Sequence, residues 1–321
     1  EDLQKTIIAK KLKFYNIDAL KISEKAGLGA RINTVMMTAF FAISGVLPKD
    51  KAIELIKTSI KKAYGKKGED VVKKNWECVD ATTAALQEVK VPAAITASFK
   101  PAKLIADDAP AFAKDIIKPL MHLKGDDVPV SKMSFDGVIP TGTAALEKRC
   151  IAPRVPKWVS ENCIQCNMCV MACPHAVVRA KQIEPANLAK KPASFITVKS
   201  KTKNDKNLDY KIQLFVDDCT GCGVCVETCP AKNKALAFST LEEEHSKGEI
   251  DNYKFFDTLP ENVLDGAGED TVKGAMFKKP LFEFSGACAG CGETPYVRML
   301  TQLFGENMVV ANATGCSSIY G

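Results

Sequence analysis

The chain has 321 residues, of which 46% are hydrophobic, and a formal net charge of +6. A chain of this length is expected to form two or three domains, and no apolar run reaches the roughly 18 residues that a membrane-spanning helix needs. Its basic residues form no stripe interleaved with aromatic residues, so nucleic-acid binding is not predicted. No secretory signal is visible, and both ends look cut. We therefore expect a cytoplasmic protein and a fragment of a longer polypeptide.

Residues 1–95 are predicted to be mainly helical. In 50–64, isoleucines recur at helical spacing, with a proline before the segment and a glycine after it. Two further helices are expected over 32–45 and 69–86. The region has no metal-ligand spacing, and we expect it to be the end of a larger α/β domain.

Residues 96–156 are rich in proline and are broken by several glycines. This composition predicts a loop-rich linker domain with one short helix over 110–122. Near its end stands the tripeptide Glu147-Lys148-Arg149, which from composition alone is expected to be a solvated, charged turn.

Thirteen cysteines are the strongest compositional signal. Clustered cysteines without a secretory signal indicate metal ligands rather than a disulfide framework. Residues 157–260 contain the motif C-x2-C-x2-C-x3-C-P twice. In this spacing the first three cysteines ligate one [4Fe–4S] cluster and the fourth ligates the other. The expected ligands are Cys163, Cys166, Cys169 and Cys229 for the first cluster, and Cys219, Cys222, Cys225 and Cys173 for the second.

The residues around these motifs carry further expectations. Gly221 and Gly223 would let backbone N–H groups approach the cluster sulfides. Alternating segments over 195–198 and 210–216, joined by a polar turn, predict a long hairpin on which Lys211 faces solvent. Two neighbouring clusters without catalytic groups around them would carry electrons. The alternative is a pair of zinc sites, each held by four thiolates.

A third cysteine group lies in the last forty residues, where Cys288, Cys291 and Cys316 are candidate ligands and a fourth is lacking. A helix over 294–304 and a strand over 308–311 are expected between them. From the residues alone, a zinc site and a redox Cys-x-x-Cys pair remain open beside an iron–sulfur cluster. The two isolated cysteines are expected to be buried as small hydrophobic residues; they are Cys78 and Cys150.

Taken together, these residues resemble the pyruvate:ferredoxin (flavodoxin) oxidoreductases, within the 2-oxoacid:ferredoxin oxidoreductase family. Four segments carry the resemblance in the family's order: GLGARINTVMMTAFFAISGVLP, the EKR tripeptide, the doubled cysteine motif, and GACAGCGETPY followed by ANATGCSSIYG. The resemblance implies an α/β multidomain fragment. Its parts would be the end of a gamma-type α/β domain (1–95), an EKR linker domain (96–156), an α+β ferredoxin-like domain with two [4Fe–4S] clusters (157–260), and the start of an α/β thiamine-diphosphate-binding domain (261–321).

The resemblance also implies the chemistry. Pyruvate would undergo oxidative decarboxylation with coenzyme A to acetyl-CoA and CO2, and electrons would pass from thiamine diphosphate through three [4Fe–4S] clusters to ferredoxin or flavodoxin. Cys288, Cys291 and Cys316 would ligate the third cluster, with the fourth ligand outside this chain. Glu293 and Cys316 would lie against thiamine diphosphate, whose Mg2+ and diphosphate would be held by sequence not in this chain. A homodimer is implied.

Two other interpretations remain open. The chain could be a two-cluster electron-transfer subunit without catalysis of its own. It could also come from a related enzyme that acts on another 2-oxo acid, because no residue in the sequence is identified as recognising the substrate's side chain.

Overall fold

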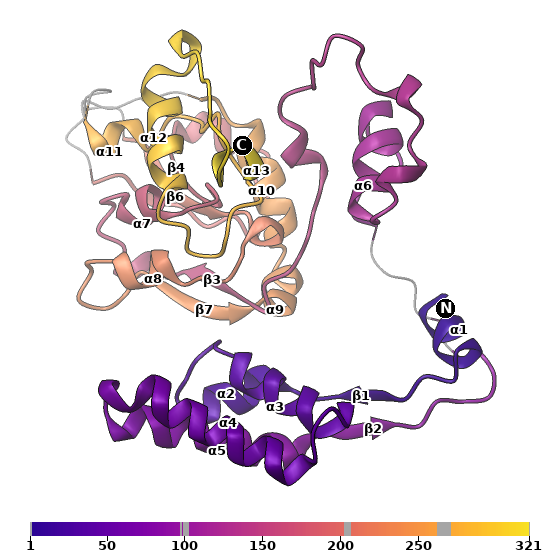
Figure 1. Ribbon diagram of the computed structural model, residues 1–321. Coiled ribbons are helices and arrows are strands. Elements are labelled where there is room, and N and C mark those ends of the chain that lie inside the picture. The colour runs from indigo at the N-terminus through magenta and orange to yellow at the C-terminus, as the bar shows by residue number, and fades with distance from the viewer. Residues whose placement is uncertain (1, 97, 99–102, 202–206, 262–270, 321) are drawn as a thin grey trace. The chain divides into compact units, whose positions relative to one another are not determined.

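The computed structural model describes residues 2–96, 98, 103–201, 207–261 and 271–320. The chain divides into two compact units, Glu1–Ala102 and Lys103–Gly321 (Figure 1). Each unit has hydrophobic cores of its own. Helices and strands are both present, so the structure is of the mixed α/β kind that the sequence predicted. Among the described residues, no helix combines the length and the apolar character needed to cross a membrane.

The first unit is built on helices that pack through apolar stripes. They are α1 (Asp2–Ala9), α2 (Ala19–Lys25), α3 (Asn33–Ser44), α4 (Lys49–Tyr64) and α5 (Glu69–Ala85). Buried residues of α4 and α5 at helical spacing meet in one core, which contains Ile56, Ile60, Val72 and Val79. The helices predicted over 32–45, 50–64 and 69–86 are confirmed, and no end lies more than one residue from its predicted position.

The first unit also contains two short strands that the sequence analysis did not predict. β1 (Phe14–Asn16) and β2 (Gln87–Val89) pair in antiparallel fashion. Strands of three residues are too short to show the alternation on which strand prediction rests. Cys78 has no exposed surface and belongs to a small core of this unit, so its predicted burial is confirmed.

Residues 103–153 begin the second unit and consist mostly of loops. Over the predicted range 110–122 the chain is helical, with a π-helix at Ala113–Ile117 followed by α6 (Lys118–Met121). Short 3-10 turns follow at Gly125–Asp127, Val130–Lys132 and Thr143–Leu146. The buried core of this segment is small and contains Ile105, Ala109 and Ala113.

The two cysteine motifs occupy two copies of one structural pattern. Each copy runs as strand, cysteine loop, short helix and strand: β3 (Arg154–Trp158), α7 (Met168–Ala172) and β4 (Val178–Ile183), then β6 (Asp209–Leu214), α8 (Val224–Thr228) and β7 (Leu236–Thr240). The strands pair between the copies, β3 with β7 and β4 with β6, always antiparallel. The helices α7 and α8 pack on each other. Neither copy therefore forms a sheet by itself.

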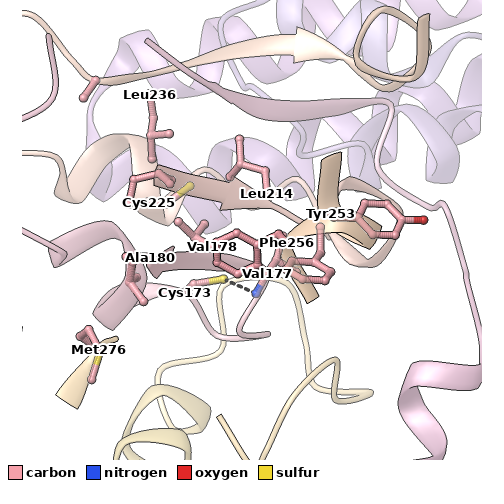
Figure 2. Close-up of a cluster of buried hydrophobic side chains, with 14 of the residues drawn as sticks. Cys173, Val177, Val178, Ala180, Leu214, Cys225, Leu236, Tyr253, Phe256 and Met276 are labelled. Atoms are coloured by element: carbon pink, nitrogen blue, oxygen red, sulfur yellow. Dashed lines mark hydrogen bonds between the residues drawn. The ribbon is translucent and has the colours of Figure 1, made fainter. Parts of the chain in front are cut away.

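The central sheet has the order β4–β6–β5, with β5 at Val198–Lys199. One face of β4 and β6 is apolar and joins the largest core of the protein, in which Cys173 and Cys225 lie among Val178, Leu214 and Leu236 (Figure 2). The predicted hairpin is confirmed in the antiparallel pairing of β5 with β6, although β5 has only two residues. Part of its predicted turn, 202–206, lies outside the described residues.

The other face of this sheet is polar, and helix α10 (Glu249–Thr258) packs against β6 (Figure 1). Lys211, on this strand, is only 5% exposed. Its ammonium group lies 5.2 Å from the centre of the Trp158 ring and 5.0 Å from that of Phe195. The prediction that Lys211 faces solvent is therefore wrong, because distant parts of the chain cover both faces of the strand.

The remaining helices are α9 (Leu241–Ser246), α11 (Val272–Ala275), α12 (Thr294–Phe304) and α13 (Ser317–Tyr320). The prediction of a helix over 294–304 is confirmed at both ends. α12 packs against α7 and α11, which joins the third cysteine group to the core that contains the two cysteine motifs. The strand predicted over 308–311 is wrong: these residues pair with no strand in the described part of the chain, and an extended segment needs a neighbour to become a strand.

Candidate metal centre

Both cysteine loops turn by the same backbone device. The residues on either side of the second cysteine adopt left-handed conformations, Gln165 and Asn167 in the first loop (φ 59° and 60°) and Gly221 and Gly223 in the second (φ 68° and 79°). Glycine reaches this region without steric cost, whereas other residues need support from their surroundings. The two loops thus share one shape despite different residues.

In the first loop, side-chain hydrogen bonds supply that support. Gln165 Nε2 donates to the Lys199 carbonyl at 2.7 Å, and Gln165 Oε1 accepts from the Lys201 N–H at 2.7 Å. Asn167 Oδ1 accepts from the Tyr210 hydroxyl, also at 2.7 Å. Both side chains are almost fully buried. The hairpin between the two motifs therefore holds the first cysteine loop in place.

The four cysteines expected for the first cluster lie together. Burial raises the pKa of the Cys169 thiol well above its ordinary value, and the charges of Cys163, Cys166 and Cys229 raise it further. Burial and the charges of three of these cysteines also raise the pKa of the Tyr210 hydroxyl, which places this tyrosine beside the group. Sequence reasoning missed Tyr210, although it lies on a strand that flanks a motif.

The four cysteines expected for the second cluster also lie together. Burial raises the pKa of Cys225, and so do the charges of Cys173, Cys219 and Cys222 together with that of Cys169 from the first group. Burial likewise raises the pKa of Cys219 to about 12. The two groups are neighbours, because α7 packs on α8 and cysteines of both groups lie in one core. The strand pairing between the copies brings each fourth cysteine to the loop of the other motif.

Backbone N–H groups point at three of these sulfur atoms. Val177 N–H donates to Cys173 Sγ at 3.3 Å, Gly221 N–H to Cys219 Sγ at 3.3 Å, and Ala235 N–H to Cys229 Sγ at 3.4 Å. The first of these bonds is drawn in Figure 2. Such bonds favour the thiolate form and tune a bound cluster. Two of the three acceptors are the cysteines that precede proline in each motif.

The chemistry of this donor set fits a cluster of several metal ions. Every cysteine in the chain is a free thiol. Within the described ranges, no three His, Cys, Asp or Glu side chains converge closely enough to hold a single ion. Five of the eight thiols of the two motifs nevertheless lie in the main core, and thiolates are the ligands of iron–sulfur clusters.

The third cysteine group lies at the surface of this unit. Cys288 and Cys316 are exposed and Cys291 is half-buried. Cys291 N–H donates to the Cys288 carbonyl at 3.0 Å, which closes a tight turn directly before α12. Burial acts to raise the pKa of Cys291, but backbone N–H groups at the start of α12, those of Thr294 and Glu293, outweigh it and lower the pKa.

Tyr320 shows that members of the third group converge. The nearby Glu293 carboxylate, together with burial and the charges of Cys291 and Cys316, raises the pKa of Tyr320 to about 12. The structure thus brings together Cys291, Cys316 and Glu293, and the turn adds Cys288. Sequence reasoning did not select Tyr320, which is the second to last residue of the chain.

The third group lies against the second cysteine loop. Gly290, between Cys288 and Cys291, has a positive φ of 75°, and a Cβ at this position would stand 3.7 Å from Cys222 Cβ. The backbone of the third group therefore runs close beside the loop of the second group.

The EKR tripeptide packs against the same loop. Lys148 Nζ lies 2.5 Å from Oδ2 of Asp218, whose side chain is 4% exposed and which directly precedes Cys219. The Lys148 ammonium also lies 4.8 Å from the centre of the Phe284 ring and 5.7 Å from that of Tyr253. Burial raises the pKa of Asp218 to about 6, although Lys148 acts to lower it. The expectation of a solvated turn, drawn from composition alone, is therefore wrong for Lys148.

A small cavity of about 50 Å³ lies beneath the tripeptide, lined among others by Glu147, Arg149, His175 and Asp218. Nε2 of His175 is 2.9 Å from the Ala287 carbonyl. Burial lowers the pKa of His175, and the charge of Arg149 lowers it further. The neutral ring donates a hydrogen bond to the segment that leads into Cys288.

Cys150 follows the tripeptide and is exposed, so the expectation that it is buried is wrong. Its backbone N–H donates to the Asp217 carbonyl at 3.1 Å. Its thiol is partly shielded, and this shielding and the charge of Asp217 raise the pKa of Cys150 to about 11. The pairing of backbone atoms, rather than packing of the thiol, fixes this residue.

Comparison with known protein families finds three models along the chain. Residues 3–85 match a model described as pyruvate ferredoxin/flavodoxin oxidoreductase, residues 99–152 match EKR, a domain of unknown function, and residues 162–233 match the 4Fe-4S dicluster domain. The last match spans both cysteine motifs, which supports an iron–sulfur protein.

Curated relatives match the chain over its whole length. A pyruvate:ferredoxin oxidoreductase of Moorella thermoacetica is 51% identical over 320 residues, which are 100% of this chain and 27% of the relative. A probable pyruvate-flavodoxin oxidoreductase of Escherichia coli is 41% identical, over 100% of this chain and 28% of the relative. A mitochondrial pyruvate dehydrogenase [NADP(+)] of Euglena gracilis is 44% identical, over 100% of this chain and 18% of the relative.

The chain thus spans about 27% of the length of the first of these relatives. The three family models follow one another along the chain, over residues 3–85, the EKR segment and the cysteine motifs. By these matches, the chain is homologous over its whole length to a stretch that covers about a quarter of the pyruvate:ferredoxin/flavodoxin oxidoreductases.

Proposed function

We propose that this chain is the electron-conducting central part of a pyruvate:ferredoxin or pyruvate:flavodoxin oxidoreductase. The complete enzyme would decarboxylate pyruvate oxidatively with coenzyme A and pass the electrons to ferredoxin or flavodoxin. The observation that carries the proposal is the convergence of eight thiols in two neighbouring groups, with a third group beside the second. The family's names point to the same reaction.

The ligand assignment follows the neighbours of each thiol. The ligands of the first [4Fe–4S] cluster are Cys163, Cys166, Cys169 and Cys229. The charges of the other three cysteines all raise the pKa of Cys169. The ligands of the second cluster are Cys173, Cys219, Cys222 and Cys225. The charges of the other three cysteines all raise the pKa of Cys225. When bound, each cluster accepts and releases a single electron. The chain's residues hold the thiolates, exclude water by burial and donate N–H hydrogen bonds to sulfur.

A third [4Fe–4S] cluster takes Cys288, Cys291 and Cys316, with its fourth ligand in sequence outside this chain. Glu293 and Cys316 would border thiamine diphosphate and its Mg2+, which the rest of the polypeptide completes. The contact of Gly290 with Cys222 supports an order of third, second and first cluster from the reaction site outward. Electrons would leave from the first cluster to the soluble carrier.

The domain assignment belongs to the same proposal. Residues 1–95 are the end of a gamma-type α/β domain, 96–156 an EKR linker domain, 157–260 a ferredoxin-like domain, and 261–321 the start of a thiamine-diphosphate domain. The ion pair of Lys148 with Asp218 and the packing of α12 on α7 support a joint role for the last three. A homodimer and a cytoplasmic location complete the proposal.

Iron and sulfide analysis of the complete, anaerobically purified enzyme tests the proposed path of three clusters. Three clusters give about twelve iron atoms per chain. A content of about eight refutes the third cluster. If the native protein also binds no thiamine diphosphate, the chain serves in a two-cluster carrier instead. Rates of ferredoxin reduction with pyruvate and with bulkier 2-oxo acids, each with and without coenzyme A, decide the substrate.

A further inference from the structure

Arg298 is a fully buried cation that the proposed electron path does not yet use. It lies on α12, two turns after Cys291, and only 1% of its surface is exposed. One guanidinium nitrogen donates to the Val170 carbonyl and, at 3.2 Å, to the Cys173 carbonyl. The other donates to the Met171 carbonyl at 2.6 Å. The guanidinium therefore caps the C-terminal end of α7, the helix that connects the two cysteine groups.

Arg298 differs from two other buried cations of this core, each of which has a carboxylate partner. Arg179 forms an ion pair with Glu283, and Lys181 lies 2.8 Å from the carboxylate of Glu261. In the part of the chain that the structure describes, Arg298 has no carboxylate partner, and its Nε has no hydrogen-bond partner. Burying a cation without an opposite charge is costly. A negative charge near this site would remove that cost.

The nearest source of such a charge is the second cysteine group. Burial lowers the pKa of Arg298, and the charge of Cys173 acts to raise it. A [4Fe–4S] cluster with four thiolates carries about −2 and becomes more negative when it is reduced. Cys173 contributes one of those thiolates in the proposed ligand set, and its carbonyl already contacts the guanidinium.

We propose that Arg298 is the counter-charge of the second cluster and raises its reduction potential, so that it accepts an electron readily from the third. This inference rests on the proposed function. In the step concerned, one electron leaves the third cluster, which is oxidised, and enters the second, which is reduced; Arg298 exchanges no proton. A fixed cation in a low-dielectric core stabilises the reduced state more than the oxidised state. Because α12 starts at the third cysteine group, the same side chain fixes the donor against the acceptor.

The test is an EPR-monitored redox titration of the complete enzyme under anaerobic conditions. Arg298→Met removes the charge, Arg298→Lys keeps it, and Gln302→Met is the matched control. Gln302 lies one turn further on the buried side of α12 and donates to the Lys278 carbonyl at 2.6 Å, so its loss loosens the helix without removing a charge. Cys222→Ser assigns the signal of the second cluster.

We expect Arg298→Met to lower the equilibrium constant for reduction of the second cluster on the order of tenfold or more. For one electron, a tenfold decrease lowers the reduction potential by about 59 mV. Arg298→Lys and Gln302→Met should stay near the wild-type potential. An unchanged potential in Arg298→Met with normal iron content overturns the proposal. So does an equal shift in Gln302→Met, because loosened packing would then be the cause.

If Arg298→Met assembles too few clusters to titrate, Arg298→Gln takes its place, since it keeps an amide donor for the α7 carbonyls and lacks the charge. A wild-type potential in that variant also overturns the proposal. The proposed function fails by a different result. A wild-type enzyme with about eight iron atoms per chain refutes the third cluster and leaves the potential of the second as a valid test of its counter-charge.

Discussion

Replacing Lys211 by methionine should change how the stability of the core around the two cysteine motifs depends on pH. Lys211 is buried between the rings of Trp158 and Phe195. Burial lowers its pKa from 10.5 to about 8, although the charge of Glu249 acts to raise it. Burial in the folded core therefore favours the neutral amine of Lys211 over the charged ammonium form.

The sign and size of the effect follow from proton binding. Between pH 8 and 10.5 the unfolded chain keeps the Lys211 proton while the folded chain has lost it, so stability rises with pH across this window. Below pH 8 both states are protonated, and the full cost of burying the charge is present. The gap between the ordinary and the lowered pKa corresponds to about 3 kcal/mol. Lys211→Met removes this dependence.

Anaerobic thermal unfolding at pH 7.5 to 10.5, followed by cluster absorbance and circular dichroism at one scan rate, measures the difference. Over this range, we expect the Tm of the wild type to rise by about 6 °C relative to that of Lys211→Met. This value follows from about 3 kcal/mol and a change in Tm of about 2 °C or more per kcal/mol for a unit of this size. Lys211→Arg is the control, because arginine stays charged throughout. Parallel pH curves for wild type and Lys211→Met would refute the reasoning.

Three further predictions concern the cysteine loops. Cys229→Ser should remove or alter the EPR signal of the first cluster, with a loss of up to about four iron atoms; loss of the second signal alone would contradict the exchanged ligands. Gly221→Ala should destabilise the core by about 2 kcal/mol, because φ is +68° and its Cβ would stand 2.9 Å from the Arg154 carbonyl. Gly65→Ala, with open space and no positive φ, should change the Tm little. Lys148→Met should cost about 2 kcal/mol in thermal unfolding, since it leaves Asp218 buried without its partner. Lys51→Met, which breaks an exposed pair with Glu54, should cost about 0.5 kcal/mol or less; equal losses in the two lysine variants would show that the EKR contact does not matter.

Local patterns predicted the helices and the cysteine loops well. Helical spacing and flanking glycine or proline give the bounds of α4, α5 and α12 because these signals lie within the elements themselves. The spacing of the two motifs led to two groups of four thiols, and the structure brings the members of each group together. Both results depend on contacts between residues close in sequence or on a repeated motif.

Burial by distant segments could not be predicted in the same way. Lys211 alternates like a solvent-facing strand residue, but α10, which begins 38 residues later, packs on its strand. Lys148 belongs to a charged tripeptide, yet its partner is Asp218, 70 residues away. Arg298 is one cation among 44 Lys and Arg residues, and only the packing of α12 on α7 distinguishes it. Tertiary contacts of this range leave no periodic signal in the sequence.

The pairing of β3 with β7 and of β4 with β6 has a consequence for biosynthesis. With the proposed ligand sets, each cluster draws thiolates from both motifs, so a nascent chain that ends between them can close neither. The ribosome must release Cys229 before the first cluster can be completed, more than sixty residues after Cys163. Iron delivered earlier would find three thiolates and an open site. Cluster insertion in this protein should therefore be a late, nearly simultaneous event for both clusters rather than a sequential one.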